Sequence, residues 1–419
     1  MLKKIWIIFP IRRIYLDSCL HKERLSFLTR KNIWHIMASM SINFKRILDI
    51  KLPIGKSAFL WGPRKVGKSY WLKEHYKDAI VIDLLNTNIF IEYGSSPWLL
   101  RERYQDTKNL IIIDEVQMVP LILNEVHWLI ENKGISFLLT GSSPRKLRET
   151  HANLLGGRAW RYTMTPLCYP EIPNLDIEKA IISGLLPSHY VAEDPILELR
   201  SYVADYLKEE IVSWSLTQNL PAFSEFLKIA AITSGELLNY TNVSRESGVS
   251  AKVVRNYFQV LEDTLLGFKL QPWRKVINRR LIESEKFYFF DVGVANYLSR
   301  RTPSLGTKEF GKSFENYILM ELKAYIAYKN PELPIYYWRT STNLEVDFIL
   351  GDMEVAVEVK SSTRVSSQDK KSLLALKEEY KLKRMIIISF ENDKRNMGDN
   401  IEHLPWRNFL EQLWSGKII

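Results

Sequence analysis

Short runs of consecutive apolar residues recur through the first 170 residues of the chain. Continuous apolar runs are typical of strands that are buried on both faces of a parallel sheet. Five such runs lie at residues 56–61, 78–86, 109–117, 135–143 and 161–167. Because segments of helical character alternate with them, the pattern predicts a doubly wound parallel sheet of the α/β class, with its ligand at the carboxyl ends of the strands.

The spacing of apolar residues changes after the prolines that follow residue 165. Between residues 174 and 220 they recur at intervals of three and four, as in Ile196–Trp214, which predicts a helical bundle. Residues 242–247 then suit a short helix, Gly248 suits a turn and Ser250 suits the N-cap of a second helix. This spacing predicts a helix-turn-helix within a winged-helix segment, and the basic residues 272–280 could form its wing.

The last third of the chain predicts a smaller α/β layer. An amphipathic helix is expected over 314–328, after a boundary at 302–313 that contains glycine and serine. Alternating polar and apolar positions predict one strand over 336–350 and another over 354–362. A helix over 367–380 and a strand over 384–390 complete the layer.

Size and composition fit this division into parts. The chain has 419 residues, of which 46% are hydrophobic, which is too long for one core. We expect an N-terminal extension over 1–40, a nucleotide-binding domain over 41–170, a helical and winged-helix domain over 171–301 and a nuclease-like domain over 302–419.

Charge and cysteine content bear on the partners and the cellular location that we expect. The net charge is +10, but residues 1–36 carry eight Lys/Arg and two Asp/Glu, so the basic character is weak support for a nucleic-acid partner. That stretch resembles a signal peptide at its start, yet Pro10 interrupts its apolar part, and the alternative is a natural start at Met37 or Met40. Two cysteines and no apolar run of about 20 residues lead us to expect a cytoplasmic protein that does not enter a membrane.

The most specific motif begins at the end of the first apolar run. The sequence WGPRKVGKSYWL places Gly62, Gly67, Lys68 and Ser69 at the spacing of a phosphate-binding loop between a strand and a helix. Backbone N–H groups and the helix N-terminus would surround the phosphates, Lys68 would neutralise them and Ser69 would hold Mg²⁺. The alternative is a structural turn. The residues expected to contact nucleotide here are Gly62, Pro63, Arg64, Lys65, Val66, Gly67, Lys68 and Ser69.

Two other apolar runs end in residues that complete such a site. Asp114 and Glu115 follow the run in NLIIIDEVQ, where Asp114 would hold Mg²⁺ and Glu115 would polarise the attacking water. Ser142, with Thr140 and Ser143, follows the run in ISFLLTGSS. These hydroxyl groups either sense the γ-phosphate or only form a turn.

Four blocks, GPRKVGKS, IIIDEVQMVP, LLTGSSPRKLRE and LLGGRAWRYTMTPL, resemble prokaryotic AAA-type ATPases of the AAA+ superfamily (AAA_14/DUF4143 type). The resemblance implies that the chain binds ATP and Mg²⁺. It also implies that an arginine, Arg158 or Arg145, contacts the γ-phosphate of its own site or that of a neighbouring copy in a homo-oligomer. The family often has Gln and Thr where this chain has Lys65 and Ser69. Serine keeps the hydroxyl group that holds Mg²⁺.

The helix-turn-helix segment offers candidate contacts to DNA. Lys252, Arg255 and Asn256 would lie near the start of its second helix, where base or phosphate contacts are usually made. The candidate phosphate contacts in the wing are Arg274, Lys275, Arg279 and Arg280. Winged helices also serve as protein-binding modules, so both partners stay open.

The C-terminal part resembles the PD-(D/E)xK nuclease-like fold. Asp347 is followed, after ten intervening residues, by Glu358-x-Lys360, and Glu315 lies on the preceding helix. The resemblance implies that Asp347, Glu358 and Glu315 bind Mg²⁺ and that Lys360 orients the attacking water. The alternative is a pair of strands with paired charges. The sequence thus supports two functions: an ATPase coupled to DNA binding and cleavage, or a nucleotide switch with an inactive nuclease-like domain.

Overall fold

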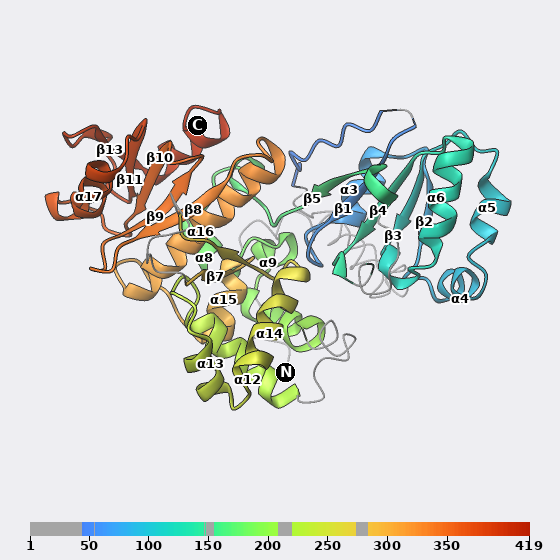
Figure 1. Ribbon diagram of the computed structural model, residues 1–419, viewed down its shortest axis with the longest axis horizontal. Helices are drawn as coiled ribbons and strands as arrows, with labels where there is room; N and C mark the ends of the chain where they lie inside the picture. The colour runs from blue at the N-terminus through green and yellow to red at the C-terminus, as the bar shows by residue number, and fades with distance from the viewer. Residues whose placement is uncertain (1–43, 54, 146, 148–154, 208–219, 274–283) are drawn as a thin grey trace, which may run out of the picture. The chain divides into compact units, whose positions relative to one another are not determined.

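The computed structural model describes residues 44–53, 55–145, 147, 155–207, 220–273 and 284–419 (Figure 1). The expected N-terminal extension over 1–40 lies outside these residues. The four basic residues expected in the wing, Arg274, Lys275, Arg279 and Arg280, also lie outside them.

A five-stranded sheet forms the first part of the fold. Its strands are β1 (Ser57–Trp61), β2 (Ile80–Asp83), β3 (Ile111–Asp114), β4 (Phe137–Gly141) and β5 (Ala159–Thr163). They lie in the order β2-β3-β4-β1-β5, and every neighbouring pair is parallel. The helices that connect them are α3 (Lys68–His75), α4 (Thr87–Ser95), α5 (Leu99–Tyr104) and α6 (Ile122–Lys133), drawn in blue to teal in Figure 1. The predicted parallel α/β sheet is therefore confirmed.

Both faces of this sheet are covered. Leu60 on β1 belongs to the same buried cluster as Trp71 of α3. Its neighbour Phe59 points to the other face, where it joins a cluster that includes Leu100 of α5 and Val126 of α6. Successive side chains of a strand point to opposite faces, so a sheet covered on both faces needs apolar residues at consecutive positions. This is the physical reason for the continuous apolar runs.

The middle of the chain is mostly helical. Its helices are α8 (Ile177–Ser183), α9 (Pro187–Val191), α10 (Pro195–Ser201), α12 (Leu220–Ile232), α13 (Tyr240–Ser247), α14 (Ala251–Asp263) and α15 (Val292–Ser299), with a π-helical turn at Tyr202–Leu207. The antiparallel strands β6 (Gly267–Leu270) and β7 (Lys286–Phe289) pair with each other. The helix expected over Ile196–Trp214 is present only as α10 and this turn, since residues 208–219 lie outside the described part.

The predicted pair of short helices is present as α13 and α14. Gly248 has a φ of 70°, a left-handed conformation that glycine adopts without steric cost, and it ends α13. The Ser250 hydroxyl accepts a hydrogen bond of 3.4 Å from the Val253 N–H, as an N-cap residue does. Local sequence signals therefore fix where α13 ends and where α14 begins.

The last part of the chain contains a mixed six-stranded sheet. Its strands are β8 (Ile335–Arg339), β9 (Glu345–Leu350), β10 (Val355–Val359), β11 (Arg384–Ser389), β12 (Arg395–Asn396) and β13 (Ile401–Pro405), in the order β12-β13-β11-β10-β9-β8. The accompanying helices are α16 (Lys308–Tyr328), α17 (Lys371–Glu379) and α18 (Trp406–Trp414). None of the helices in the described ranges is long and apolar enough to cross a membrane.

Two local expectations for this part are wrong. The segment 336–350 is not one strand but the antiparallel pair β8 and β9. Asn343, with a φ of 64°, lies in the turn between them, because asparagine tolerates the left-handed region better than most residues. Helix α16 begins at Lys308, six residues before the expected start, because the Thr307 side chain caps it by accepting a hydrogen bond from the Phe310 N–H. The expected boundary at 302–313 therefore lies partly inside this helix.

Candidate nucleotide-binding site

The loop between β1 and α3 has the backbone that a phosphate-binding loop requires. Gly67 has a φ of 98°, and Lys65 also lies in the left-handed region, with a φ of 63°. A Cβ atom at Gly62 would lie 2.5 Å from the carbonyl oxygen of Met164, so only glycine fits there. The Lys68 side chain is buried, and its ammonium donates hydrogen bonds to the carbonyl oxygens of Gly62, at 2.6 Å, and Pro63, at 3.1 Å. The loop is thus curled around the amine of Lys68.

The start of α3 and the end of β3 bring together two oxygen ligands suited to Mg²⁺. The Ser69 hydroxyl, on the first turn of α3, donates a 2.6 Å hydrogen bond to Oδ2 of Asp114 at the end of β3. Asp114 also accepts a hydrogen bond from Thr140 at the end of β4. A hydroxyl and a carboxylate in contact are hard oxygen ligands of the kind that Mg²⁺ prefers, so these residues fit the ion that the motif implies.

Glu115 adopts a conformation that is rare for a side chain with a Cβ atom. Its φ is 57°, in the left-handed region, and only 7% of the residue is exposed. Its N–H donates to the Thr140 hydroxyl at 3.3 Å, and its carboxylate accepts a hydrogen bond from the Gln117 side chain. Strained backbone at a site is a pointer to function. Here the strained residue directly follows Asp114, and its carboxylate is held by Gln117.

Gln117 connects the ends of two strands, and the sequence analysis did not assign it a role. Its amide also donates to the Ser142 hydroxyl, at 3.2 Å, so one side chain links Glu115 with Ser142. The side chain also fills the space over Gly141, where a Cβ atom would lie 2.2 Å from Oε1 of Gln117. The sequence signal that could have indicated a role for Gln117 is its position two residues after Glu115, just beyond the acidic end of a strand.

Both candidate arginines pair with acidic residues outside the phosphate-binding loop. Arg158 forms an ion pair with Glu131 at the surface. Arg145 pairs with Asp263 of α14 at 3.1 Å, and the Ser143 hydroxyl donates to the Asp263 carbonyl oxygen at 2.7 Å. A role of either arginine at its own or a neighbouring site therefore stays a prediction.

Arg46 is a second residue that the sequence analysis did not assign. It is buried and donates to the carbonyl oxygens of Val66, in the phosphate-binding loop, and of Thr165, both at 2.6 Å. Its Nε donates to Glu171 at 3.0 Å, and the buried carboxylate compensates its charge. Arg46 thus holds the back of the loop, but no local pattern in the sequence marks it.

The carboxylates predicted for the nuclease-like site lie in the C-terminal sheet. Asp347 on β9 accepts a 2.7 Å hydrogen bond from the N–H of Val359, and Lys360 donates to Glu358 at 2.5 Å. Burial, together with repulsion by Glu358 and Glu315, raises the pKa of Asp347 well above its usual range. Burial raises the pKa of Glu358 to about 7, although Lys360 opposes this shift. Oε2 of Glu358 has no hydrogen-bond partner among the residues that the structure describes. The structure therefore places Asp347, Glu358 and Lys360 together.

Glu315 is engaged by a residue from another element. The Tyr288 hydroxyl donates to Glu315 at 2.5 Å, and the buried ammonium of Lys286, also on β7, lies 3.4 Å from it. Lys286 also pairs with Glu345 of β9 at 2.5 Å. In the described part of the chain no three His, Cys, Asp or Glu side chains are arranged to hold a metal ion. Asp347 and Glu358 thus supply two buried carboxyl groups, whereas Glu315 faces a lysine.

The described DNA-binding candidates lie on one helix. Lys252, Arg255 and Asn256 are exposed in the first half of α14. The guanidinium of Arg255 lies over the ring of Tyr240, 5.0 Å from its centroid. The three side chains are accessible to a partner, and the structure contains no partner chain.

Comparisons with known proteins match three successive segments of the chain. Residues 55–173 are similar to a family described as an AAA domain. Residues 174–305 are similar to a domain of unknown function, DUF8612, and residues 310–409 to another, DUF4143. The AAA match covers the parallel sheet and the phosphate-binding loop. Residues 55–173 are therefore similar in sequence to AAA domains, and they fold into the parallel sheet described above.

Relatives occur in bacteria and archaea. An uncharacterized protein of Mycobacterium tuberculosis is 25% identical over 307 residues, which cover 71% of this chain and 68% of the relative, and one of Mycobacterium bovis matches to the same extent. An uncharacterized protein of Methanocaldococcus jannaschii is 24% identical over 351 residues, which cover 75% of this chain and 76% of that protein. Among solved structures, the Aeropyrum pernix ORC1 protein in complex with DNA matches with 13% identity and a TM-score of 0.24, over 58% of this chain and 86% of that chain.

Proposed function

We propose that this protein binds and hydrolyses ATP with Mg²⁺ in its 41–170 domain and uses the nucleotide cycle to control the domains over 171–301 and 302–419. The observation that carries the proposal is the contact between the Ser69 hydroxyl and the Asp114 carboxylate at the carboxyl ends of two parallel strands. It stands beside a loop whose buried lysine and left-handed glycine suit phosphate. Mg²⁺ held by Ser69 and Asp114 would supply positive charge at the phosphates.

The residues of the chain divide the remaining work. Loop N–H groups and Lys68 bind the β- and γ-phosphates, and burial of Lys68 strengthens that attraction. Glu115 accepts a proton from the attacking water as a general base. Gln117 and Thr140 hold Glu115 toward that water. Ser142 lies within reach of Gln117, so it links the γ-phosphate end of the site to the base.

The test separates binding from hydrolysis. Lys68→Ala should abolish binding of ATP–Mg²⁺ in calorimetry, because the triphosphate loses its main buried cation. Glu115→Gln should bind ATP with unchanged affinity and hydrolyse it at least a hundredfold more slowly. Lys73→Ala, an exposed lysine on α3, is the matched control and should behave as wild type. Tight ATP binding by the Lys68 variant would overturn the proposal.

A second function, metal-dependent cleavage of DNA by the 302–419 domain, is favoured by one observation. A buried carboxylate oxygen of Glu358 finds no hydrogen-bond partner in the described ranges, and it lies in a cluster where the pKa values of two carboxyl groups are raised. A divalent ion would relieve that repulsion. In this proposal Asp347 and Glu358 hold the ion and Lys360 orients water, while Lys252, Arg255 and Asn256 contact DNA.

Purified protein, labelled DNA and Mg²⁺ or Mn²⁺ decide between cleavage and a nucleotide switch with an inactive nuclease-like domain. Cleavage by the wild-type protein that Glu358→Ala abolishes would support the nuclease. Equal nicking by both proteins would identify a contaminant. No cleavage by either protein would favour the switch, in which the same domains bind DNA or a protein partner.

A further inference from the structure

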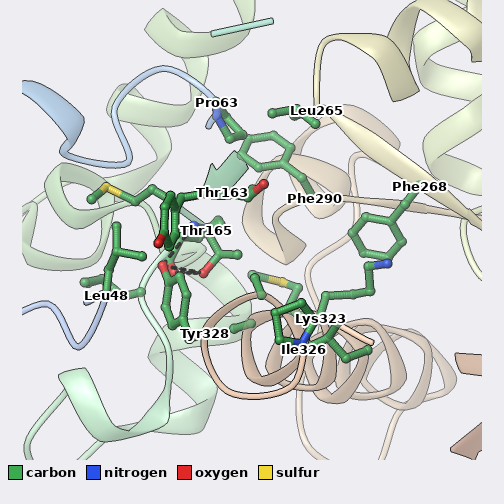
Figure 2. Close-up of a pocket in the computed structure, with 18 of the residues that line it drawn as sticks. Leu48, Pro63, Thr163, Thr165, Leu265, Phe268, Phe290, Lys323, Ile326 and Tyr328 are labelled. Carbon is green, nitrogen blue, oxygen red and sulfur yellow. Dashed lines mark hydrogen bonds between the residues drawn. The ribbon is translucent and has the colours of Figure 1, made fainter. Parts of the chain in front are cut away.

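A cavity of about 530 Å³ lies against one face of α16, and no role has been assigned to it (Figure 2). One side is formed by α16 residues at intervals of three and four, among them Met320, Lys323, Ala327 and Tyr328. Pro63 is the only phosphate-loop residue in its lining. The cavity is therefore next to the nucleotide site but distinct from its catalytic groups.

The opposite walls come from two other parts of the chain. Thr163 ends β5 and Thr165 follows it, whereas Leu265, Phe268 and Phe290 come from the segments around β6 and β7. Figure 2 shows these side chains gathered around the same space. The lining is mainly apolar and aromatic with a few polar groups. This composition and volume are typical of small-molecule sites.

Small side chains create the space on the helix. Ala324 and Ala327 lie on α16 between the longer Lys323 and Tyr328, and both line the cavity. The Tyr328 hydroxyl is fully engaged, since it is hydrogen-bonded to Arg46 and to the N–H and hydroxyl of Thr165. Tyr328 therefore acts as a fixed wall. The charged residues of the lining are Lys323 on α16, Arg161 on β5, and the acids Asp49 and Glu262.

Lys323 forms no direct ion pair with an acidic residue of the described ranges. Its ammonium lies 5.4 Å from the centroid of the Phe268 ring, and among the described residues it forms no ion pair or hydrogen bond. The nearest acid, Glu262, is paired with Lys269 at 2.8 Å. Burial lowers the pKa of Lys323, and Glu262 offsets this shift only in part. A half-buried cation against an aromatic wall favours an anion beside it.

We propose that this cavity binds a small amphipathic anion. An aromatic or branched apolar body would lie between Phe268, Phe290 and the alanine face of α16. A carboxylate, sulfonate or phosphate group on that body would pair with Lys323. The apolar lining supplies burial energy, and Lys323 supplies the preference for charge.

The fluorescent probe 8-anilino-1-naphthalenesulfonate, which combines an aromatic body with an anion, tests the proposal on the full chain. We expect saturable binding at one site, with affinity reduced at least tenfold in Lys323→Met. Lys308→Met, an exposed lysine at the start of the same helix, is the control and should bind as wild type. The anion 1-naphthoate should displace the probe, whereas neutral 1-naphthylmethanol should not do so at the same concentration.

Three outcomes would overturn the proposal. Equal affinity of Lys323→Met and wild type would show that the probe binds elsewhere. Displacement by ATP–Mg²⁺ that Lys68→Ala prevents would assign the cavity to the nucleotide site. A second variant, Ala327→Phe, fills the cavity while it keeps Lys323, and unchanged binding by this variant, with a wild-type circular dichroism melting curve, would also exclude the site. If the wild-type protein did not hydrolyse ATP, the probe experiment would still be valid, because it measures probe fluorescence and not hydrolysis.

Discussion

At the scale of single residues, the candidate ATP site depends on side chains that are held by one another. Glu115 is kept in a left-handed backbone conformation, and its carboxylate accepts a hydrogen bond from Gln117. That arrangement costs conformational energy, which the surrounding contacts must offset. The residues in direct contact with the base are therefore as important as the base.

Gln117→Leu tests this view. The change keeps the size of the buried side chain but removes the donor that holds the Glu115 carboxylate. We expect kcat for ATP hydrolysis to fall about tenfold while the affinity for ATP stays unchanged, because positioning acts on the chemical step. Steady-state hydrolysis and nucleotide titration measure the two effects. A change in affinity with normal kcat would place Gln117 in binding instead.

His189 gives the fold a sensitivity to acid. The residue is fully buried on α9, and within the described part of the chain neither ring nitrogen has a hydrogen-bond partner. Burial, with a contribution from Lys65 and against that of Glu198, lowers the pKa of His189 to about 4. The unfolded chain binds a proton near pH 6.5 and the folded chain does not, so folding stability is lost as pH falls from 6.5 toward 4.

His189→Phe removes this titration. We expect wild-type unfolding free energy to fall with pH below 6.5 more steeply than that of the variant, by up to about 1.4 kcal/mol per pH unit. Chemical denaturation at pH 7.0, 6.0 and 5.0 measures the difference between the two proteins. Parallel curves would mean that the pKa of His189 is the same in the folded and the unfolded chain.

At the scale of elements, β7 joins the middle segment to the carboxylates of the C-terminal sheet. Lys286 is 2% exposed and pairs with Glu345 of β9 and Glu315 of α16. Although burial alone lowers the pKa of Lys286, these carboxylates raise it well above its ordinary value. The ammonium thus supplies positive charge where a metal ion would supply it.

Lys286→Met should therefore change the metal affinity of the C-terminal sheet. Without the internal cation, Glu315 becomes available beside Asp347 and Glu358. We expect Mn²⁺ binding, followed by electron paramagnetic resonance of the free ion, to strengthen at least tenfold. Lys269→Met on the paired strand β6 is the control, and a second substitution, Glu358→Ala, should remove the gain. Tight Mn²⁺ binding by the wild type would show that Lys286 does not compete with the ion.

At the scale of the whole molecule, Arg46 connects segments that are far apart in the sequence. It contacts Glu171 and the phosphate-binding loop, and Tyr328 of α16 forms a 2.9 Å hydrogen bond with it. Burial alone lowers the pKa of Arg46, but Tyr328 and Glu171 raise it above its usual value, so the guanidinium stays charged. Loss of one partner from a buried ion pair leaves the other charge without compensation.

Arg46→Met should destabilise the protein by about 3 kcal/mol, because Glu171 would stay buried without its partner. Tyr328→Phe removes one hydrogen bond and should cost about 1 kcal/mol. Urea denaturation of both variants measures these differences. An equal decrease in unfolding free energy for the two variants would show that the hydrogen bond to Tyr328, rather than the ion pair with Glu171, accounts for the stabilising effect of Arg46.

Much of the fold could be predicted because its signals are local. The apolar runs predicted the strands of the parallel sheet, and Gly248 and Ser250 marked the ends of α13 and α14. The turn between β8 and β9 was missed, because the polar run at residues 340–343 contains neither glycine nor proline. Local patterning cannot separate a long strand from a hairpin when the turn lacks glycine and proline.

The sequence by itself determined which groups the loop over residues 62–69 offers to a phosphate. Glycine, lysine and serine stand there at fixed spacing, so their N–H groups and side chains come from one short stretch. Only the tertiary structure decided which distant groups meet. Gln117 reaches Ser142, Arg46 reaches the loop, Lys286 neutralises Glu315, and Lys323 faces an apolar cavity. These contacts join residues on different elements, and their energies come from burial and charge pairing that no short stretch of sequence specifies.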